Sequence, residues 1–264
     1  MQAFINGITM AYDEAGEGPP ILLIHGFPLN RRMWRPQLNK LPLSGYRVIV
    51  PDLRGFGESD APEGPYSMEL FADDIVGLMD HLEIEQAVIG GMSMGGYVLY
   101  NLLERYPERL RAAIFITTRC TADDEAGKAR RLQLATDVRK FGPQMVADAF
   151  VKLLFAPGTQ LERPKLVEEV YGWMAETDSR GLAGGLLAMR DRKDYCPFLG
   201  SIAIPALAIG AEGDQAAPPE TARAIAAGIP GCKLAIIPNA GHLANLEDVK
   251  AFNAAVLEFL AGLA

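Results

Sequence analysis

The sequence predicts an α/β protein in which helices cover both faces of a mostly parallel sheet, and two patterns carry this prediction. Short, almost continuously apolar runs alternate with longer stretches of helical periodicity, as expected for parallel strands that are buried on both sides. The chain also opens with Asn6-Gly7 between two strand-like segments, a hairpin signal that predicts antiparallel strands at the start of the sheet. The apolar runs lie at 21–26, 46–52, 86–91, 112–118, 205–211 and 233–239.

The helical stretches between these runs carry apolar side chains at three- and four-residue intervals. This spacing gathers the apolar side chains on one face of a helix, which can then pack against the sheet. The example at 67–82, SMELFADDIVGLMDHL, has this spacing at Leu70, Phe71, Ile75, Leu78, Met79 and Leu82. A strand, a helix and a further strand in this order predict a βαβ unit.

Residues 120–195 interrupt the alternation of strands and helices. Four helical patterns follow one another there without a strand between them. Such an insertion suggests a helical cap over the carboxyl edge of the sheet, although a bundle with a purely structural role is the alternative. The length of 264 residues is compatible with one large core. We therefore expect a single domain over 1–264, with the cap at about 120–195.

Composition and charge narrow the classes of partner. The formal net charge is −8 and no basic cluster with interleaved aromatic residues occurs, so nucleic acid is not an expected partner. The first ten residues lack the basic and apolar segments of a secretory signal, and no apolar run reaches the roughly 18 residues of a membrane span. We expect a cytoplasmic protein without a membrane partner.

The three cysteines, Cys120, Cys196 and Cys232, are widely spaced. Their odd number and the lack of any zinc-binding spacing predict reduced, structural thiols and no metal site. The GFGE segment at 55–58 lacks the third glycine of a dinucleotide-binding loop, so NAD binding is not expected either.

The stretch GGMSMGGY at 90–97 places a serine directly after an apolar strand and before an apolar helix. Gly91, Ser93 and Gly95 form the GxSxG pattern in the context of a nucleophile elbow. A chain that turns from strand to helix at one residue brings the positions two before and two after it into near contact, so both must lack a Cβ. We expect Ser93 to be an exposed nucleophile, with the helix beginning around Gly96 and Tyr97. A chance match is the alternative.

A nucleophilic serine needs a base, and the base needs an acid that sets its tautomer. In this architecture the chain order is serine, acid, histidine. Of the three histidines, His25 and His81 precede Ser93, which leaves His242 as the base. Asp214 follows the preceding predicted strand and is the expected acid. A solvated aspartate that caps the next helix is the alternative for Asp214.

Acyl transfer also needs two backbone N–H groups that face the developing oxyanion. The N–H of Met94, directly after the nucleophile, is one expected donor. The N–H of Phe27, in the HGFP loop after the first parallel strand, is the other, and Pro28 restricts Phe27 to extended conformations. We expect His25 to be structural.

Together the segments HGFPLN, VPDLRGFGESD, GGMSMGGY, GAEGD and NAGH resemble the α/β-hydrolase superfamily over nearly the whole chain. More narrowly, the chain is similar to capped carboxylesterases and 3-oxoadipate enol-lactonases, a group that includes cofactor-free serine haloperoxidases. The resemblance implies an eight-stranded sheet, a helical cap and the triad Ser93, Asp214 and His242. One departure is that no proline follows Glu247.

These residues predict a serine hydrolase that cleaves small carboxylic esters through an acyl-enzyme and needs no metal or organic cofactor. A lactonase of the 3-oxoadipate enol-lactonase type is one alternative. A receptor that binds a ligand without turnover is another, because this fold also supports binding proteins.

The residues that bind the substrate are harder to predict. Arg119, at the end of the strand before the cap, is a candidate for binding a substrate carboxylate, with a surface salt bridge as the alternative. The apolar candidates could equally form the core of the cap. They are Leu29, Phe150, Leu154, Trp173, Leu187 and Met189.

Overall fold

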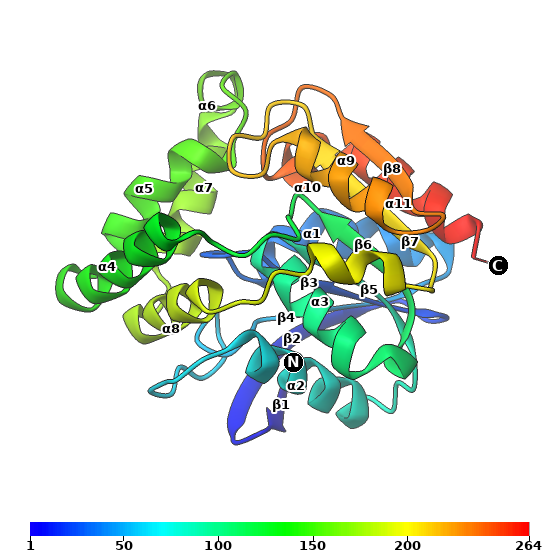
Figure 1. Ribbon diagram of the computed structural model, residues 1–264, viewed down its shortest axis with the longest axis horizontal. Helices are drawn as coiled ribbons and strands as arrows, with labels where there is room; N and C mark the ends of the chain where they lie inside the picture. Colours follow the sequence, from blue (N-terminus) through cyan, green and yellow to red (C-terminus); the bar gives the residue numbers. More distant parts are fainter. Residues whose placement is uncertain (264) are drawn as a thin grey trace.

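The structure, a computed structural model, describes residues 1–263 and contains an eight-stranded sheet (Figure 1). The strand order is β1-β2-β4-β3-β5-β6-β7-β8, with antiparallel pairing of β2 to β1 and to β4 and parallel pairing elsewhere. The predicted mixed, mostly parallel sheet is therefore confirmed. The strands are β1 (Gln2–Ile5), β2 (Ile8–Ala15), β3 (Pro20–Ile24), β4 (Arg47–Pro51), β5 (Ala87–Met92), β6 (Leu110–Ile116), β7 (Ala206–Ala211) and β8 (Lys233–Ile237).

The first hairpin has the tight turn that its sequence predicts. Asn6 and Gly7 both have positive φ, 47° and 81°, and they connect Ile5 to its paired neighbour Ile8. Two positive φ angles match the right-handed twist of the flanking strands, and Asn-Gly tolerates this conformation best. The sheet therefore begins with a short antiparallel edge.

Alternate side chains of the parallel strands enter two separate cores. In β3, Leu22 and Ile24 pack on one face, whereas Ile21 and Leu23 pack on the other. Side chains of α2, α3 and α9 complete the first core, and those of α1, α10 and α11 adjoin the second. No helix among residues 1–263 is long and apolar enough to cross a membrane. The helices over the two faces are α1 (Arg35–Lys40), α2 (Met68–His81), α3 (Met94–Arg105), α9 (Pro219–Gly228), α10 (Ala244–Glu247) and α11 (Val249–Ala261), with short 3₁₀ turns at η1 (Arg31–Trp34), η2 (Leu41–Ser44), η3 (Pro107–Arg109) and η4 (Cys196–Ser201).

Five helices lie between β6 and β7 in the chain and gather on one side of the sheet (Figure 1). Helix α4 packs on α8, and α5 packs on α7. The sequence predicted four helical patterns here, and the additional helix is the single turn α6, which is too short to show a periodicity. These inserted helices are α4 (Glu125–Phe141), α5 (Gln144–Leu154), α6 (Thr159–Glu162), α7 (Pro164–Ala175) and α8 (Ser179–Arg190).

The prediction that all three cysteines are reduced is wrong. Cys120, just after β6, forms a disulfide with Cys196, at the start of η4, and only Cys232 is free. The partners are 76 residues apart in the chain, so their spacing gave no sign of the pairing. The fold brings them together because the inserted helices leave the sheet and return to it at neighbouring points, where the Tyr195 N–H also donates to the Cys120 carbonyl at 2.8 Å.

Candidate active site

Ser93 occupies a sharp turn between β5 and α3. It has φ 52° and ψ −110°, and α3 begins at the next residue, Met94, two residues earlier than the sequence predicted. A Cβ on Gly91 would lie 2.2 Å from the Gly95 carbonyl oxygen, and a Cβ on Gly95 would lie 2.5 Å from the Ile24 carbonyl oxygen. Only glycine fits at either position, as the nucleophile-elbow interpretation requires.

The backbone around Ser93 is held by β6 and the residues that follow it. The Ser93 N–H donates to the Ile116 carbonyl at 3.0 Å, and its carbonyl accepts from the Thr118 hydroxyl at 2.8 Å. Ser93 is partly exposed between the buried residues Met92 and Met94. Positive φ at a residue other than glycine costs energy and persists where the surroundings fix it, often at functional sites.

His242 and Asp214 form a buried pair. His242 Nδ1 lies 2.7 Å from Asp214 Oδ2, and each residue is only 4% exposed. The other carboxylate oxygen, Oδ1, accepts from the N–H groups of Ala216 and Ala217 at 2.8 and 2.9 Å. Because a carboxylate faces Nδ1, the hydrogen of a neutral His242 ring lies on Nδ1 and Nε2 is free to take a proton.

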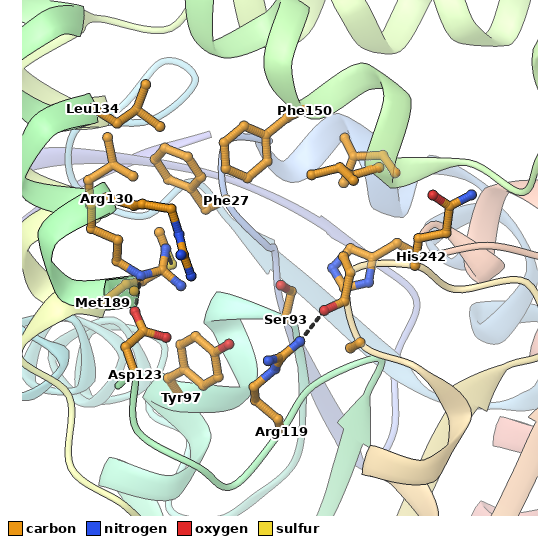
Figure 2. Close-up of a pocket in the computed structure, with 18 residues that line it drawn as sticks. Phe27, Ser93, Tyr97, Arg119, Asp123, Arg130, Leu134, Phe150, Met189 and His242 are labelled. Atoms are coloured by element: carbon orange, nitrogen blue, oxygen red, sulfur yellow. Dashed lines mark hydrogen bonds and ion pairs between the residues drawn. The ribbon is translucent and has the colours of Figure 1, made fainter. Parts of the chain in front are cut away.

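Ser93 and His242 line the same cavity, which has a volume of about 480 Å³. Figure 2 shows the Ser93 side chain between His242 on one side and residues of the inserted helices on the other. No direct hydrogen bond joins the Ser93 hydroxyl to the His242 ring within residues 1–263. Catalytic hydrogen bonds are often long in free enzymes and shorten only when substrate binds.

The loop after β3 lies against the turn at Ser93. A Cβ on Gly26 would lie 2.4 Å from Met92 Sδ and 3.1 Å from Ser93 Cβ. The next residue, Phe27, is 3% exposed and precedes a cis peptide bond to Pro28. In the described part of the chain, neither the Phe27 N–H nor the Met94 N–H donates to a protein acceptor. Two unpaired N–H groups next to Ser93 could stabilise an oxyanion, as expected from the sequence.

His25 fixes this loop in place. Its Nε2 accepts from the Leu53 N–H at 3.0 Å, so the ring hydrogen lies on Nδ1, which is 2.9 Å from the Gly26 carbonyl oxygen. Burial lowers the pKa of His25 below its ordinary value because the interior penalises the charged ring, and this effect exceeds the opposing attraction of Asp52. His25 is therefore a neutral link between two loops, as the sequence predicted.

Glu247 is a supporting residue that sequence reasoning missed. Its Oε1 accepts from the Gly241 N–H at 2.8 Å, and its Oε2 accepts from the Ala156 N–H at 2.8 Å and the Thr159 hydroxyl at 2.5 Å. One carboxylate thus joins the loop that carries His242 to the segment between α5 and α6. The only signal in the sequence was the glutamate five residues after His242.

Some of the predicted substrate-binding residues line the cavity. These are Arg119, Phe150, Leu154 and Met189. One guanidinium nitrogen of Arg119 donates to the carbonyl oxygen of Ala216, in the loop that follows Asp214, which supports its placement at the site.

The other predicted substrate-binding residues, Leu29, Trp173 and Leu187, do not line the cavity, and their part in substrate binding stays a prediction. Leu29 is fully buried in the core on the α11 side of the sheet, and Trp173 is 6% exposed in the same core. Leu187 lies one residue beyond Leu186, which does line the cavity. One step along a helix turns a side chain by about 100°, and Leu187 borders a separate groove beside α4.

The structure adds lining residues that the sequence had not indicated. Tyr97 comes from α3, whereas Leu186 comes from α8. Helix α4 contributes one face at helical spacing, with positions 127, 130, 131 and 134 toward the cavity. The cap residues expected at the cavity were apolar, whereas this face carries Arg130 and Arg131. Among residues 1–263 no group of three or more His, Cys, Asp or Glu side chains is placed to hold a metal ion.

A mixed eight-stranded sheet with a serine turn after β5 and a His–Asp pair on the loops after β8 and β7 defines the class of α/β hydrolases. A family model described as "alpha/beta hydrolase fold" matches residues 19–249. This chain belongs to the α/β-hydrolase family and is a hydrolase.

Individual relatives agree with the resemblance found in the sequence. The chain is 31% identical to 3-oxoadipate enol-lactonase 2 of Acinetobacter baylyi over 94% of this chain and 92% of the relative. A malate-bound thermophilic esterase from Thermogutta terrifontis has a TM-score of 0.96 at 35% identity, covering 100% of this chain and 98% of the esterase. The enol-lactonase from Burkholderia xenovorans has a TM-score of 0.92 at 31% identity, covering 99% of this chain and 100% of the enol-lactonase.

Proposed function

We propose that this protein is a serine hydrolase that cleaves small carboxylic esters through an acyl-enzyme. The observation that carries the proposal is the buried His242–Asp214 pair, 2.7 Å apart, which shares a cavity with the strained, partly exposed Ser93. A hydroxyl, an imidazole with a free Nε2 and an acid that orients the ring are the three parts of a nucleophilic triad.

In this mechanism, Ser93 Oγ attacks the ester carbonyl carbon while His242 Nε2 takes the hydroxyl proton. The N–H groups of Phe27 and Met94 stabilise the oxyanion of the tetrahedral intermediate. The bond to the leaving alkoxide then breaks, and the alcohol departs with the proton from His242. Water attacks the resulting acyl-enzyme by the same steps, which releases the carboxylic acid and restores Ser93.

The test is hydrolysis of short-chain para-nitrophenyl esters by the wild type, Ser93→Ala and the control Ser44→Ala. Ser44 is exposed and lies outside the cavity. We expect Ser93→Ala to lose at least about 10³-fold in kcat, as triad variants do, while Ser44→Ala retains the wild-type rate. A phosphonate ester should add its mass to the peptide that contains Ser93. Full turnover by Ser93→Ala would refute the assignment.

The inserted helices support a second part of the proposal, that they form a cap over the site within one domain. Phe150 of α5 and Met189 of α8 line the same cavity as Ser93. A small-molecule ester fits a cavity of this size. The cytoplasmic location remains a prediction. The disulfide between Cys120 and Cys196 argues against it, because disulfides persist mainly in oxidising compartments.

Lactone hydrolysis is the second candidate function, and the guanidinium groups in the cavity favour it because an enol-lactone of the 3-oxoadipate type is anionic. Relative values of kcat/KM for a neutral ester and for this lactone separate the two activities. A receptor role would require a ligand that binds without any turnover by the wild type, and the intact Ser93, His242 and Asp214 argue against it.

A further inference from the structure

The cavity beside Ser93 is cationic although the whole chain is acidic. Three guanidinium groups, those of Arg119, Arg130 and Arg131, line it, against the single carboxylate of Asp123. The formal net charge of the chain is −8. The cavity lining therefore has two positive charges in excess, whereas the chain as a whole is negative. A partly enclosed cavity with this charge attracts anions locally.

Asp123 does not neutralise this excess, because its charge is already shared. It forms ion pairs with Arg131 and with Arg192 at 2.7 Å, and the Arg192 side chain is only 3% exposed. Burial would raise the pKa of Asp123, but the two guanidinium groups bonded to it lower that pKa to about 2. Asp123 is therefore ionised at neutral pH and is paired with the cations on its own side of the cavity.

The other acidic groups near the cavity are also engaged. Asp214 accepts from the His242 ring and from the two N–H groups that follow it. Asp124 caps the first turn of α4 through the Gly127 N–H, and Glu125 pairs with Lys128. None of these contacts supplies a counter-charge to Arg130.

Arg130 is the cation in the cavity that has no partner. It forms no ion pair or hydrogen bond among residues 1–263, whereas Arg131 is held by Asp123 and Arg119 donates to the Ala216 carbonyl. Figure 2 shows Arg130 on the side of Ser93 opposite His242. A planar guanidinium with free N–H groups binds a carboxylate through two parallel hydrogen bonds.

We propose that this cavity selects esters that carry a free carboxylate, and that Arg130 is the specificity-determining residue that binds this carboxylate, with Arg119 adding a second positive charge. The inference rests on the proposed function, because it places the ester carbonyl at Ser93 and the carboxylate toward α4. Arg130 acts on substrate choice and takes no part in the bond-breaking steps.

The test uses pairs of substrates that differ in this charge. One member is the mono-para-nitrophenyl ester of succinic, glutaric or adipic acid, and the other is the same compound with its free carboxyl group converted to a methyl ester. We expect the wild type to prefer the anionic member of at least one pair. In Arg130→Gln the ratio of kcat/KM between anion and methyl ester should fall about tenfold, as expected when a charge-assisted hydrogen bond to an exposed guanidinium is lost. Arg130→Lys should keep part of the preference.

The matched control is Arg139→Gln. Arg139 lies on the same helix, but it borders a separate groove and pairs with the exposed Glu63. The control removes the same charge from the same helix. Because Arg139 lies outside the cavity, Arg139→Gln should keep the wild-type ratio. Equal ratios in wild type and Arg130→Gln, or an equal loss in Arg139→Gln, would overturn the inference.

A binding measurement separates this inference from the proposed function. The affinity for glutarate is measured by calorimetry at low ionic strength. Glutarate should bind the wild type and Arg139→Gln equally, and it should bind Arg130→Gln about tenfold more weakly. If no ester is turned over but glutarate binding depends on Arg130, the proposed function fails and the carboxylate site stands. If esters are hydrolysed without regard to charge and glutarate binds all three proteins equally or not at all, the carboxylate site fails and the proposed function stands.

Discussion

Glu247 Oε1 accepts a hydrogen bond from the Gly241 N–H at 2.8 Å, one residue before His242. The same carboxylate accepts from Ala156 and Thr159, so it fixes the position of the His242 loop against the inserted helices. A Cβ on Gly241 would lie 2.3 Å from the Ala156 nitrogen, which shows how closely the two segments approach.

The first prediction concerns Glu247→Gln. The amide keeps the shape of the side chain, but its NH₂ group would face an N–H donor, so at least one buried backbone donor loses its acceptor. We expect a loss of about 1–3 kcal/mol in the free energy of unfolding, together with a lower kcat on esters because His242 is less well held. Urea unfolding and steady-state kinetics measure the two effects. Glu258→Gln, an exposed position on α11, is the control, and an equal effect there would contradict the role of Glu247.

The second prediction concerns the glycine that packs under the turn at Ser93. In Gly95→Ala the new methyl group would lie 2.5 Å from the Ile24 carbonyl oxygen and 2.8 Å from that of His25. Backbone atoms cannot move aside cheaply, so we expect destabilisation of at least about 1–3 kcal/mol in urea unfolding.

Gly172→Ala is the control for this substitution. Gly172 lies in α7, and a Cβ there would meet no atom within 4 Å. Alanine should stabilise the protein by about 0.4–1 kcal/mol, since it favours helix and restricts the unfolded chain. Equal stabilities of the two variants would be incompatible with the close packing at Gly95.

The third prediction concerns the disulfide between Cys120 and Cys196. Thiol titration of protein purified without reductant and unfolded in guanidinium should detect one thiol, that of Cys232, and three after reduction. Reduction should lower the free energy of unfolding by about 2–4 kcal/mol, because the bridge closes a long loop in the unfolded chain. The double variant Cys120→Ala/Cys196→Ala should not respond to reductant, and three thiols before reduction would contradict the bridge.

The fourth prediction concerns pH. The pKa of His25 is lowered in the folded protein, mainly by burial, from the 6.5 of an ordinary histidine. Below about pH 6.5 the unfolded chain binds a proton that the folded protein does not, so the free energy of unfolding falls by up to about 1.4 kcal/mol per pH unit until the folded pKa is reached. The full contribution is present above about pH 6.5.

Urea unfolding at a series of pH values measures this slope. His25→Asn should make it shallower, whereas His81→Asn, which removes an exposed ring, is the control. Nitrogen NMR of the wild type should show a neutral His25 ring with its hydrogen on Nδ1. A charged ring at about pH 6 would contradict the assignment.

The sequence predicted the sheet and the serine turn well because both depend on local rules. Apolar runs, the Asn6-Gly7 hairpin and the glycines around Ser93 each restrict the backbone within a few residues. The pairing of Asp214 with His242 was predictable from chain order, since loops after parallel strands meet at one edge of the sheet.

The remaining features depend on contacts between distant segments. Nothing near Cys120 or Cys196 signals their pairing across 76 residues. The helical patterns within 120–195 do not set which face of a helix turns to the cavity, which is lined by Leu186 and not by Leu187. Arg130 was missed because a charged residue on an exposed helix normally faces water, and only the tertiary structure shows that this one lines the cavity.

The bridge between Cys120 and Cys196 also affects how the inserted helices can change in evolution. The Cα atoms of Cys120 and Cys196 are only 4.9 Å apart. The inserted segment therefore forms a closed loop whose two ends meet at one place beside the sheet. Residues can be added to or removed from such a loop without altering the pairing of β6 with β7. New substrate preferences can therefore arise by lengthening, shortening or exchanging these helices while Ser93, Asp214 and His242 keep their places.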